Sequence, residues 1–218
     1  RGDEPSRAGS CVLARLSHSH IRVGTFQRLA ALEDRASLTH LVDYVMATYF
    51  PDRHGEGNAA TALFDIVCTR VARLAAQRMG AGFVHGVLNT DNINITGESF
   101  DYGPWRFLPR YDPAFVAAYF DQSGLYAFGR QPEAVLLTLA RLAECLIPLT
   151  AIDDLPKIFD DFPDRYEMPM NNVIVKRLGL SSISSNDDRD LSSATWTFLE
   201  RSGIGIENLF FVWYGAAH

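Results

Sequence analysis

The segment from Ala60 to Met79 constrains the fold more than any other part of the sequence. Its apolar side chains recur every three or four positions, which places them on one face of an α-helix. Gly80 and Gly82 follow directly and are expected to close the helix, because glycine readily adopts the backbone conformation found beyond helix ends. This is the clearest secondary-structure element in the sequence.

Other helices are expected on similar grounds. Ser37 can cap a helix over the residues that follow it, and Pro132 can open another. Asp112 and Pro113 are placed as the cap and first residue of a short helix. The chain is therefore expected to be mostly helical. Weaker helical patterns cover residues 172–178 and 191–201.

A polar stretch follows the long helix, and residues 83–104 read FVHGVLNTDNINITGESFDYGP. The alternation of isoleucine with asparagine and a turn at Thr96–Gly97 predict a β-hairpin. In the expected register, Asn92 lies opposite Asp101. Directly opposed residues have Cβ atoms about 4.5–5.5 Å apart.

One amide oxygen and one carboxylate that face each other form half of a magnesium site, because Mg²⁺ takes its other ligands from water and substrate phosphates. Asp91 lies one residue upstream of Asn92, where it could accept a proton from an attacking hydroxyl. The alternative is an ordinary turn, since Asn, Asp and Gly are also the usual turn residues.

The composition excludes several classes of partner. The formal net charge is −6, and the sequence has no stripe of basic residues. Both features argue against nucleic acid as a partner. No apolar run approaches the roughly 20 residues that a membrane helix needs. Cys11, Cys68 and Cys145 are odd in number and far apart, which indicates reduced thiols and not a disulfide framework or a zinc site. These features favour a cytoplasmic protein.

The pattern HGxLxxxN followed by DYG resembles the catalytic loop and the Asp-Phe-Gly motif of protein-kinase-like enzymes. In those enzymes the catalytic aspartate lies five residues before the metal-binding asparagine. Counting back from Asn92 gives Val87, which cannot accept a proton. The resemblance therefore indicates a pseudokinase in which Asp91 is the nearby carboxylate able to serve as the base.

Together with SHSHIRVGTFQ, YDP and QPEAVLLTLARLAECLIPL, these motifs resemble the selenoprotein O (SelO) family of kinase-fold proteins. The resemblance is strongest over residues 12–26 and 82–149. It implies an α+β, mostly helical fold, with a protein-kinase-like C-terminal lobe that contains the catalytic-loop hairpin. It also implies transfer of AMP from ATP to Ser, Thr or Tyr hydroxyls of proteins, with release of pyrophosphate. His85 is expected to hold the catalytic loop through its ring nitrogens.

The SelO resemblance assigns roles to individual residues. Asp91 would be the proton acceptor, and Asn92 and Asp101 would bind Mg²⁺, or Mn²⁺ in its place. Asp101 would also lie against the phosphates of the nucleotide. Arg15 and Arg22 match the arginines that hold the terminal phosphate of an ATP bound in the inverted orientation, a role suited to charge-assisted hydrogen bonds.

The resemblance also implies an incomplete chain. We expect residues 1–150 to form a partial kinase-like core and residues 151–218 a partial C-terminal helical region. The glycine-rich loop of the N-terminal lobe, together with its lysine and glutamate, has no match here, so we expect this chain alone to bind ATP weakly or not at all. The expected location is cytoplasmic, or mitochondrial in a eukaryote. Two alternatives remain: an ordinary protein phosphotransferase that uses Asp91, or a truncated non-catalytic copy.

Overall fold

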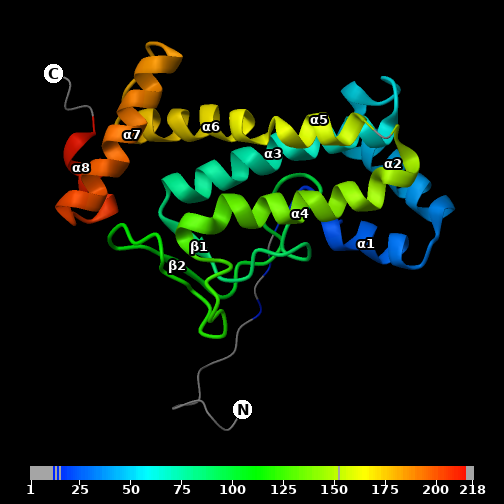
Figure 1. Cartoon of the computed structure of the whole chain (residues 1–218), viewed down its shortest axis with the longest axis horizontal. Coiled ribbons are helices and arrows are strands. Elements are labelled where there is room, and N and C mark those ends of the chain that lie inside the picture. The colour runs from blue at the N-terminus through cyan, green and yellow to red at the C-terminus, as the bar shows by residue number, and fades with distance from the viewer. Residues whose placement is uncertain (1–11, 13, 15, 152, 215–218) are drawn as a thin grey trace, which may run out of the picture.

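The computed structural model describes residues 12, 14, 16–151 and 153–214. This part of the chain is mostly helical with one small antiparallel sheet, which confirms the expected α+β class (Figure 1). The α-helices and strands, in chain order, are α1 (Val23–Ala31), α2 (Arg35–Tyr49), α3 (Ala59–Gly80), β1 (Phe83–His85), β2 (Trp105–Phe107), α4 (Gln131–Leu146), α5 (Asp154–Asp160), α6 (Phe162–Arg177), α7 (Ser185–Ser202) and α8 (Ile206–Trp213).

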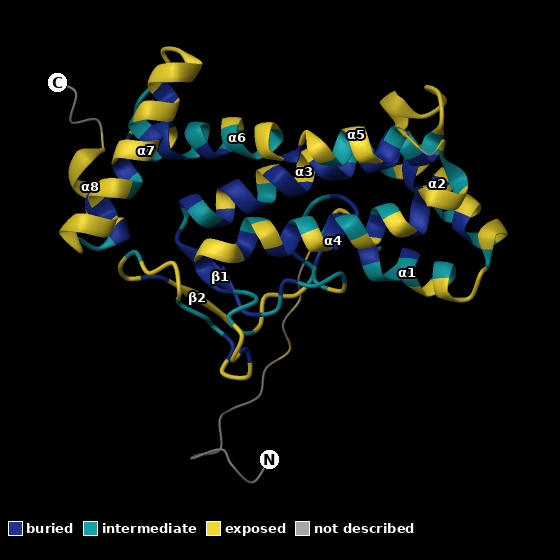
Figure 2. Cartoon of the chain, viewed as in Figure 1, coloured by how far each residue is buried: buried dark blue, intermediate teal, exposed yellow. Residues whose placement is uncertain are grey.

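Helix α3 lies in the middle of the molecule and confirms the helix predicted over residues 60–79 (Figure 1). The Asn58 side chain caps it by accepting a hydrogen bond from the backbone N–H of Thr61 at 2.9 Å. Much of α3 is buried, as Figure 2 shows, because helices α2, α4, α5 and α6 all pack against it. Phe64 belongs to one hydrophobic cluster and Ala76 to a second, so α3 joins the two.

Two predictions about helix starts were wrong. Helix α2 begins at Arg35, and its cap is the Asp34 side chain, which accepts a hydrogen bond from the N–H of Ser37 at 3.0 Å. No helix starts at Asp112. Instead, its carboxylate accepts a hydrogen bond from the N–H of Ala114 at 3.0 Å and closes an isolated turn.

The later helices are longer than their sequence patterns predicted. Helix α4 does begin beside Pro132, as expected. Helix α6, however, extends well before residue 172 and includes Pro169, and α7 begins at Ser185 because the Ser184 side chain caps it. No helix in the described ranges is long and apolar enough to cross a membrane.

The polar stretch forms a short hairpin whose register differs from the predicted one. Ile93 forms a bridge with Ser99, and the N–H of Phe100 donates to the carbonyl of Asn92 at 3.0 Å. Asn92 therefore lies opposite Phe100 and not opposite Asp101. The shift arises because the turn includes a third residue: the N–H of Asn94 donates to the carbonyl of Glu98 at 2.8 Å, with Gly97 at φ 78° inside the loop.

Helices α5 and α6 run along α3, and α7 and α8 form one end of the molecule (Figure 1). Their apolar side chains join both hydrophobic clusters, for example Phe162 in the first and Ile174 in the second. The division of the chain near residue 150 stays a prediction.

Candidate active site

The loop between β1 and the hairpin is hydrogen-bonded to the start of helix α1. The N–H of Val23 donates to the carbonyl of Ile93 at 3.1 Å, and the N–H of Gly24 donates to the carbonyl of Thr90 at 3.0 Å. Arg22 also forms a bridge with Asn94. Segments that lie far apart in the sequence thus form one backbone unit around residues 90–94.

Asp91 lies at the N-terminus of helix α1. A Cβ atom added to Gly24 would be 2.3 Å from its Oδ1 atom, so the carboxylate occupies the space that a side chain at position 24 would need. The Nη1 atom of Arg22 is 3.9 Å from the same oxygen. The Asp91 side chain is 62% exposed. A helix N-terminus and a guanidinium group both favour negative charge, so this environment suits a carboxylate that is open to an incoming group.

His85 connects the loop at Val87 to the segment that begins at Asp101. Its Nδ1 atom accepts a hydrogen bond from the N–H of Val87 at 3.1 Å, and its Nε2 atom lies 2.5 Å from the carbonyl oxygen of Asp101. Burial, helped by the nearby Arg78 cation, lowers the pKa of His85 to about 4. The ring is therefore neutral at physiological pH, with its proton on Nε2, and it holds the loop in the way the sequence indicated.

Gln131, at the start of helix α4, completes the outer edge of strand β1. Its Oε1 atom accepts a hydrogen bond from the N–H of His85 at 3.0 Å, and its Nε2 atom donates to the carbonyl of Phe83 at 2.8 Å. The side-chain amide thus substitutes for a third strand. Sequence reasoning missed this role, because the helical pattern of α4 does not indicate which strand its first side chain meets.

The two expected metal ligands present oxygen atoms. The Nδ2 atom of Asn92 donates to the carbonyl of Val87 at 2.7 Å, which leaves Oδ1 as the group available to a ligand. Oδ1 of Asp101 accepts hydrogen bonds from the N–H groups of Tyr102 at 2.7 Å and Gly103 at 3.3 Å, while its Oδ2 takes none from the described residues.

An amide oxygen and a free carboxylate oxygen fit a hard cation such as Mg²⁺, which completes its coordination with water and phosphate oxygens. The described residues contain no cluster of three His, Cys, Asp or Glu side chains that could hold a metal ion. A site built on Asn92 and Asp101 would therefore depend on a phosphorylated substrate for further ligands.

Of the two predicted phosphate-binding arginines, the structure places Arg22 in this region. Its guanidinium group lies 4.6 Å from the centre of the Phe100 ring, close to Asp91. Arg15 lies outside the described residues. The structure thus brings Arg22 and Asp91 together, places Asn92 on the same loop, and connects Asp101 to that loop through His85.

A buried arginine beneath the hairpin was not anticipated. Arg78, on the last turn of α3, is 5% exposed and donates to the Oγ atom of Ser99. Burial lowers its pKa to about 10, so it remains a cation at neutral pH. Its Nη1 atom has no hydrogen-bond partner among the described residues. Arg78 therefore adds positive charge beside Ser99, in the segment that leads to Asp101.

The family model described as protein adenylyltransferase SelO matches residues 1–214 of the chain. The chain belongs to the SelO family.

Curated SelO-family relatives carry the name protein nucleotidyltransferase YdiU. The protein from Synechocystis sp. is 45% identical over 185 residues, which cover 84% of this chain and 39% of the relative. The protein from Synechococcus sp. is 42% identical over 212 residues, covering 96% of this chain and 43% of the relative. The Gloeobacter violaceus protein is 40% identical over 210 residues, which cover 96% of this chain and 44% of the relative. This chain therefore spans less than half the length of these relatives.

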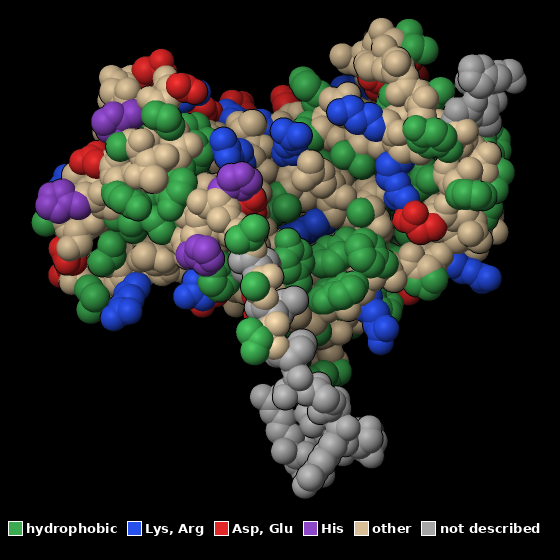
Figure 3. Space-filling view, turned by 180° about the vertical axis from the view of Figure 1, so that it is seen from behind, with side chains coloured by type: hydrophobic (Ala, Val, Ile, Leu, Met, Phe, Trp, Pro, Cys, Tyr) green, Lys and Arg blue, Asp and Glu red, His purple; other side chains and the backbone are tan. Residues whose placement is uncertain are grey.

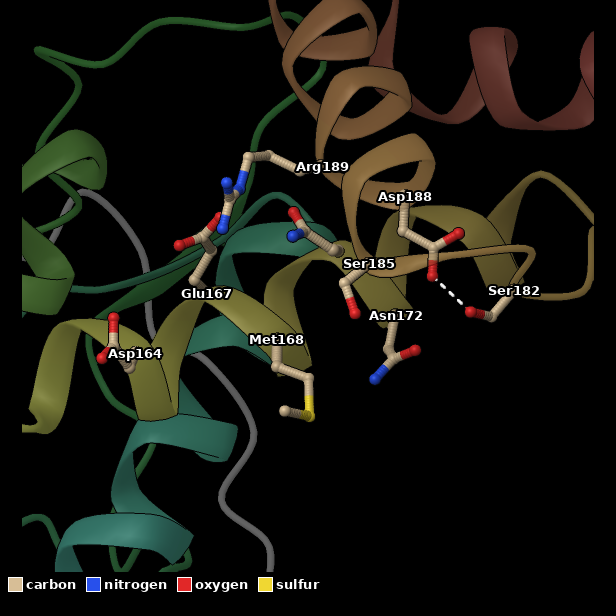
Figure 4. A pocket seen from close by; sticks show the side chains of 9 residues that line it. Asp164, Glu167, Met168, Asn172, Ser182, Ser185, Asp188 and Arg189 are labelled. Atoms are coloured by element: carbon tan, nitrogen blue, oxygen red, sulfur yellow. Dashed lines mark hydrogen bonds and ion pairs between the residues drawn. The ribbon is translucent and has the colours of Figure 1, made fainter.

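A hollow of about 350 Å³ lies between α6 and α7 of this SelO-family chain, away from the catalytic loop (Figure 4). Two of the carboxylates that line it have partners: Glu167 pairs with Arg189, and Asp188 accepts a hydrogen bond from Ser182 at 2.5 Å. Asp164 also lines the hollow. We assign no ligand to this hollow.

Proposed function

We propose that this chain provides the catalytic loop of a protein adenylyltransferase that transfers AMP from ATP to Ser, Thr or Tyr hydroxyls of other proteins. One observation carries the proposal most strongly. Val87 occupies the position of the usual base, whereas the Asp91 carboxylate is exposed beside Arg22 and the α1 N-terminus. Membership of the SelO family supports the same reaction class.

In the proposed reaction, the acceptor hydroxyl oxygen forms a bond to the α-phosphorus of ATP. The bond from that phosphorus to the bridging oxygen of pyrophosphate breaks, and pyrophosphate leaves with the electron pair. Asp91 takes the hydroxyl proton, as a positioned general base does. Arg22 and Arg15 hold the terminal phosphate of the inverted nucleotide, for which guanidinium groups are well suited.

Asn92 and Asp101 would hold Mg²⁺, or Mn²⁺ in its place. The ion would supply neutralisation of phosphate charge when bound. The His85 ring positions these residues, because it is hydrogen-bonded to the backbone at both Val87 and Asp101. We propose a protein-kinase-like C-terminal lobe as the fold that this arrangement represents.

We propose the activity for the longer protein, because the relatives that share the family are more than twice as long as the segment that they match. A cytoplasmic location is also proposed. Supporting it, Cys68 and Cys145 are buried free thiols, which is typical of proteins from reducing compartments.

The test uses the product of the longest open reading frame that contains this chain. It is incubated with Mg²⁺ and ATP labelled at either the α- or the γ-phosphate, and protein-bound label is measured. We expect label from the α position. Label from the γ position would overturn adenylyl transfer and favour the phosphotransferase alternative.

An Asp91→Asn variant tests the base. We expect loss of transfer with an unchanged melting temperature, because the side chain is exposed and makes no packing contact that a core would need. Asp43→Asn is the matched control, since Asp43 is an exposed carboxylate on α2. Full activity in the Asp91 variant would remove Asp91 from the mechanism.

A thermal-shift titration with Mg–ATP tests nucleotide binding by the 218-residue chain itself. Binding to the folded state raises the melting temperature as ligand concentration exceeds Kd. We expect the longer protein to show a clearly larger shift than this chain. The absence of a shift in both would favour the non-catalytic alternative.

A further inference from the structure

A second groove lies at the turn end of the hairpin, away from the end that carries Asn92 and Asp101. It has a volume of about 740 Å³ and lies between the hairpin turn, helix α3 and the end of helix α2. The turn packs closely on α3, because a Cβ atom at Gly97 would be 2.4 Å from the Cβ atom of Arg70. The walls of the groove are therefore held together by direct contact.

Two arginines from successive positions on one face of α3 line this groove. Arg70 is exposed but held in place: its Nη1 atom donates to the carbonyl of Thr96 at 3.2 Å, and its guanidinium lies 4.7 Å from the centre of the Phe50 ring. Arg73, three residues later, is exposed and forms no ion pair or side-chain hydrogen bond with the described residues. One cation is thus fixed and the other is available.

The carboxylate in the groove already has partners. Glu98 receives hydrogen bonds from Ser17 and Thr96, both at 3.1 Å, and pairs with the Nδ1 atom of His18 at 2.6 Å. It pairs with neither Arg70 nor Arg73. The two guanidinium groups therefore present positive charge in a protein whose formal net charge is −6. In the view of Figure 3, some Lys and Arg side chains lie near histidines and others are spread over the surface.

We propose that this groove binds a phosphate-bearing small molecule. Guanidinium groups match phosphate oxygens in geometry and charge, and two of them three residues apart on a helix can contact one phosphate group or two linked ones. The hydroxyl of Thr48 and the amide of Gln77 add hydrogen-bonding groups, and the half-buried Tyr49 adds a ring surface. The volume lies within the range of about 300–1,000 Å³ that is usual for small-molecule pockets.

This proposal does not depend on the proposed transfer reaction. The groove contains none of Arg22, Asp91, Asn92 or Asp101. Binding here therefore needs neither the metal nor the catalytic carboxylate, and the two sites can be tested separately in the same preparation.

The probe is inorganic pyrophosphate, titrated calorimetrically into the 218-residue chain at about 0.15 M salt with EDTA present, an ionic strength that screens weak surface charge. The principal variant is Arg70→Gln/Arg73→Gln. The matched control is Arg28→Gln/Arg35→Gln, which removes the same charge from exposed positions on α1 and α2. Arg22→Gln reports binding at the candidate active site.

We expect the Arg70/Arg73 variant to bind pyrophosphate about tenfold or more weakly, because each lost guanidinium removes charge-assisted hydrogen bonds. The control pair should bind as the unaltered chain does. Arg73→Gln alone should also weaken binding, and its exposed side chain makes it a variant that folds. Equal affinity in all chains, equal weakening in the control pair, or loss only in Arg22→Gln would each overturn the proposal.

Discussion

Replacing Gly24 with alanine should separate the effect of the position of the Asp91 carboxylate from the effect of fold stability. The new Cβ atom would be 2.3 Å from Oδ1 of Asp91 and 3.2 Å from its Cγ. Since ordinary contacts begin at 3.4 Å, the carboxylate must retreat by about 1 Å, and a displacement of that size can reduce a catalysed rate by about 10²-fold. Asp91 is exposed and can rotate into solvent, so the backbone need not move.

The stability of the Gly24→Ala variant should be unchanged or slightly higher. Alanine is favoured over glycine within a helix by about 0.5–1 kcal/mol, which offsets the rotation of one exposed side chain. The assay combines thermal denaturation with transfer of label from α-labelled ATP in the longer protein, and Arg28→Ala on the same helix serves as the control. Full activity in Gly24→Ala would refute the placement of Asp91 as the base. If the free energy of unfolding fell by more than about 2 kcal/mol, as is typical of a buried steric clash, rotation of the Asp91 side chain would not be what relieves the clash.

Three further predictions concern the support of the site. Gln131→Ala should lower the free energy of unfolding by about 1–3 kcal/mol, because it leaves a buried N–H and a buried carbonyl of β1 unpaired. Urea denaturation would measure the difference, with Gln122→Ala at an exposed position as the control. The pKa of His85 is lower in the folded state than the ordinary value of 6.5, so unfolding at acidic pH takes up a proton. The contribution of neutral His85 to the free energy of unfolding should be fully present above about pH 6.5 and should fall as the pH is lowered towards 4. Melting temperatures measured across this pH range should depend less on pH in the His85→Gln variant. Burial raises the pKa of Cys68 to about 12 and that of Cys145 to about 11, so mass spectrometry should find both unalkylated after iodoacetamide treatment of the native protein at pH 8, and modification at the same rate as in the denatured chain would contradict their burial.

The helical framework could be predicted where periodicity was long and the boundaries carried strong signals. The long apolar pattern of α3 and the proline at the start of α4 both gave correct helices. The start of α2 was wrong because Asp34 and Ser37 are both good capping residues, and local sequence does not decide between them. The extra length of α6 and α7 depends on packing, which overrides weak propensity: α6 packs against α3, and α7 packs against α6.

The candidate site was predicted as a set of residues but not as an arrangement. Counting positions placed Val87 where kinase-like enzymes have their base, which stays a prediction, and the hairpin was expected from its alternation. Its register was wrong by one residue because the choice between a two-residue and a three-residue turn depends on how Gly97 packs against Arg70. The closeness of Asp91 to Gly24 depends on contacts between distant segments, which no local pattern encodes.

The amide of Gln131 has a consequence for how far this protein could be reduced in size. Within the residues that the structure describes, strand β1 pairs with β2, and its other edge is hydrogen-bonded by the first residue of helix α4. A peptide excised to contain the catalytic loop and its hairpin alone would therefore lose the hydrogen bonds that align His85. Any minimal version of the SelO catalytic loop has to retain α4, so the smallest unit able to keep this geometry is defined by a helix that supplies no reacting group.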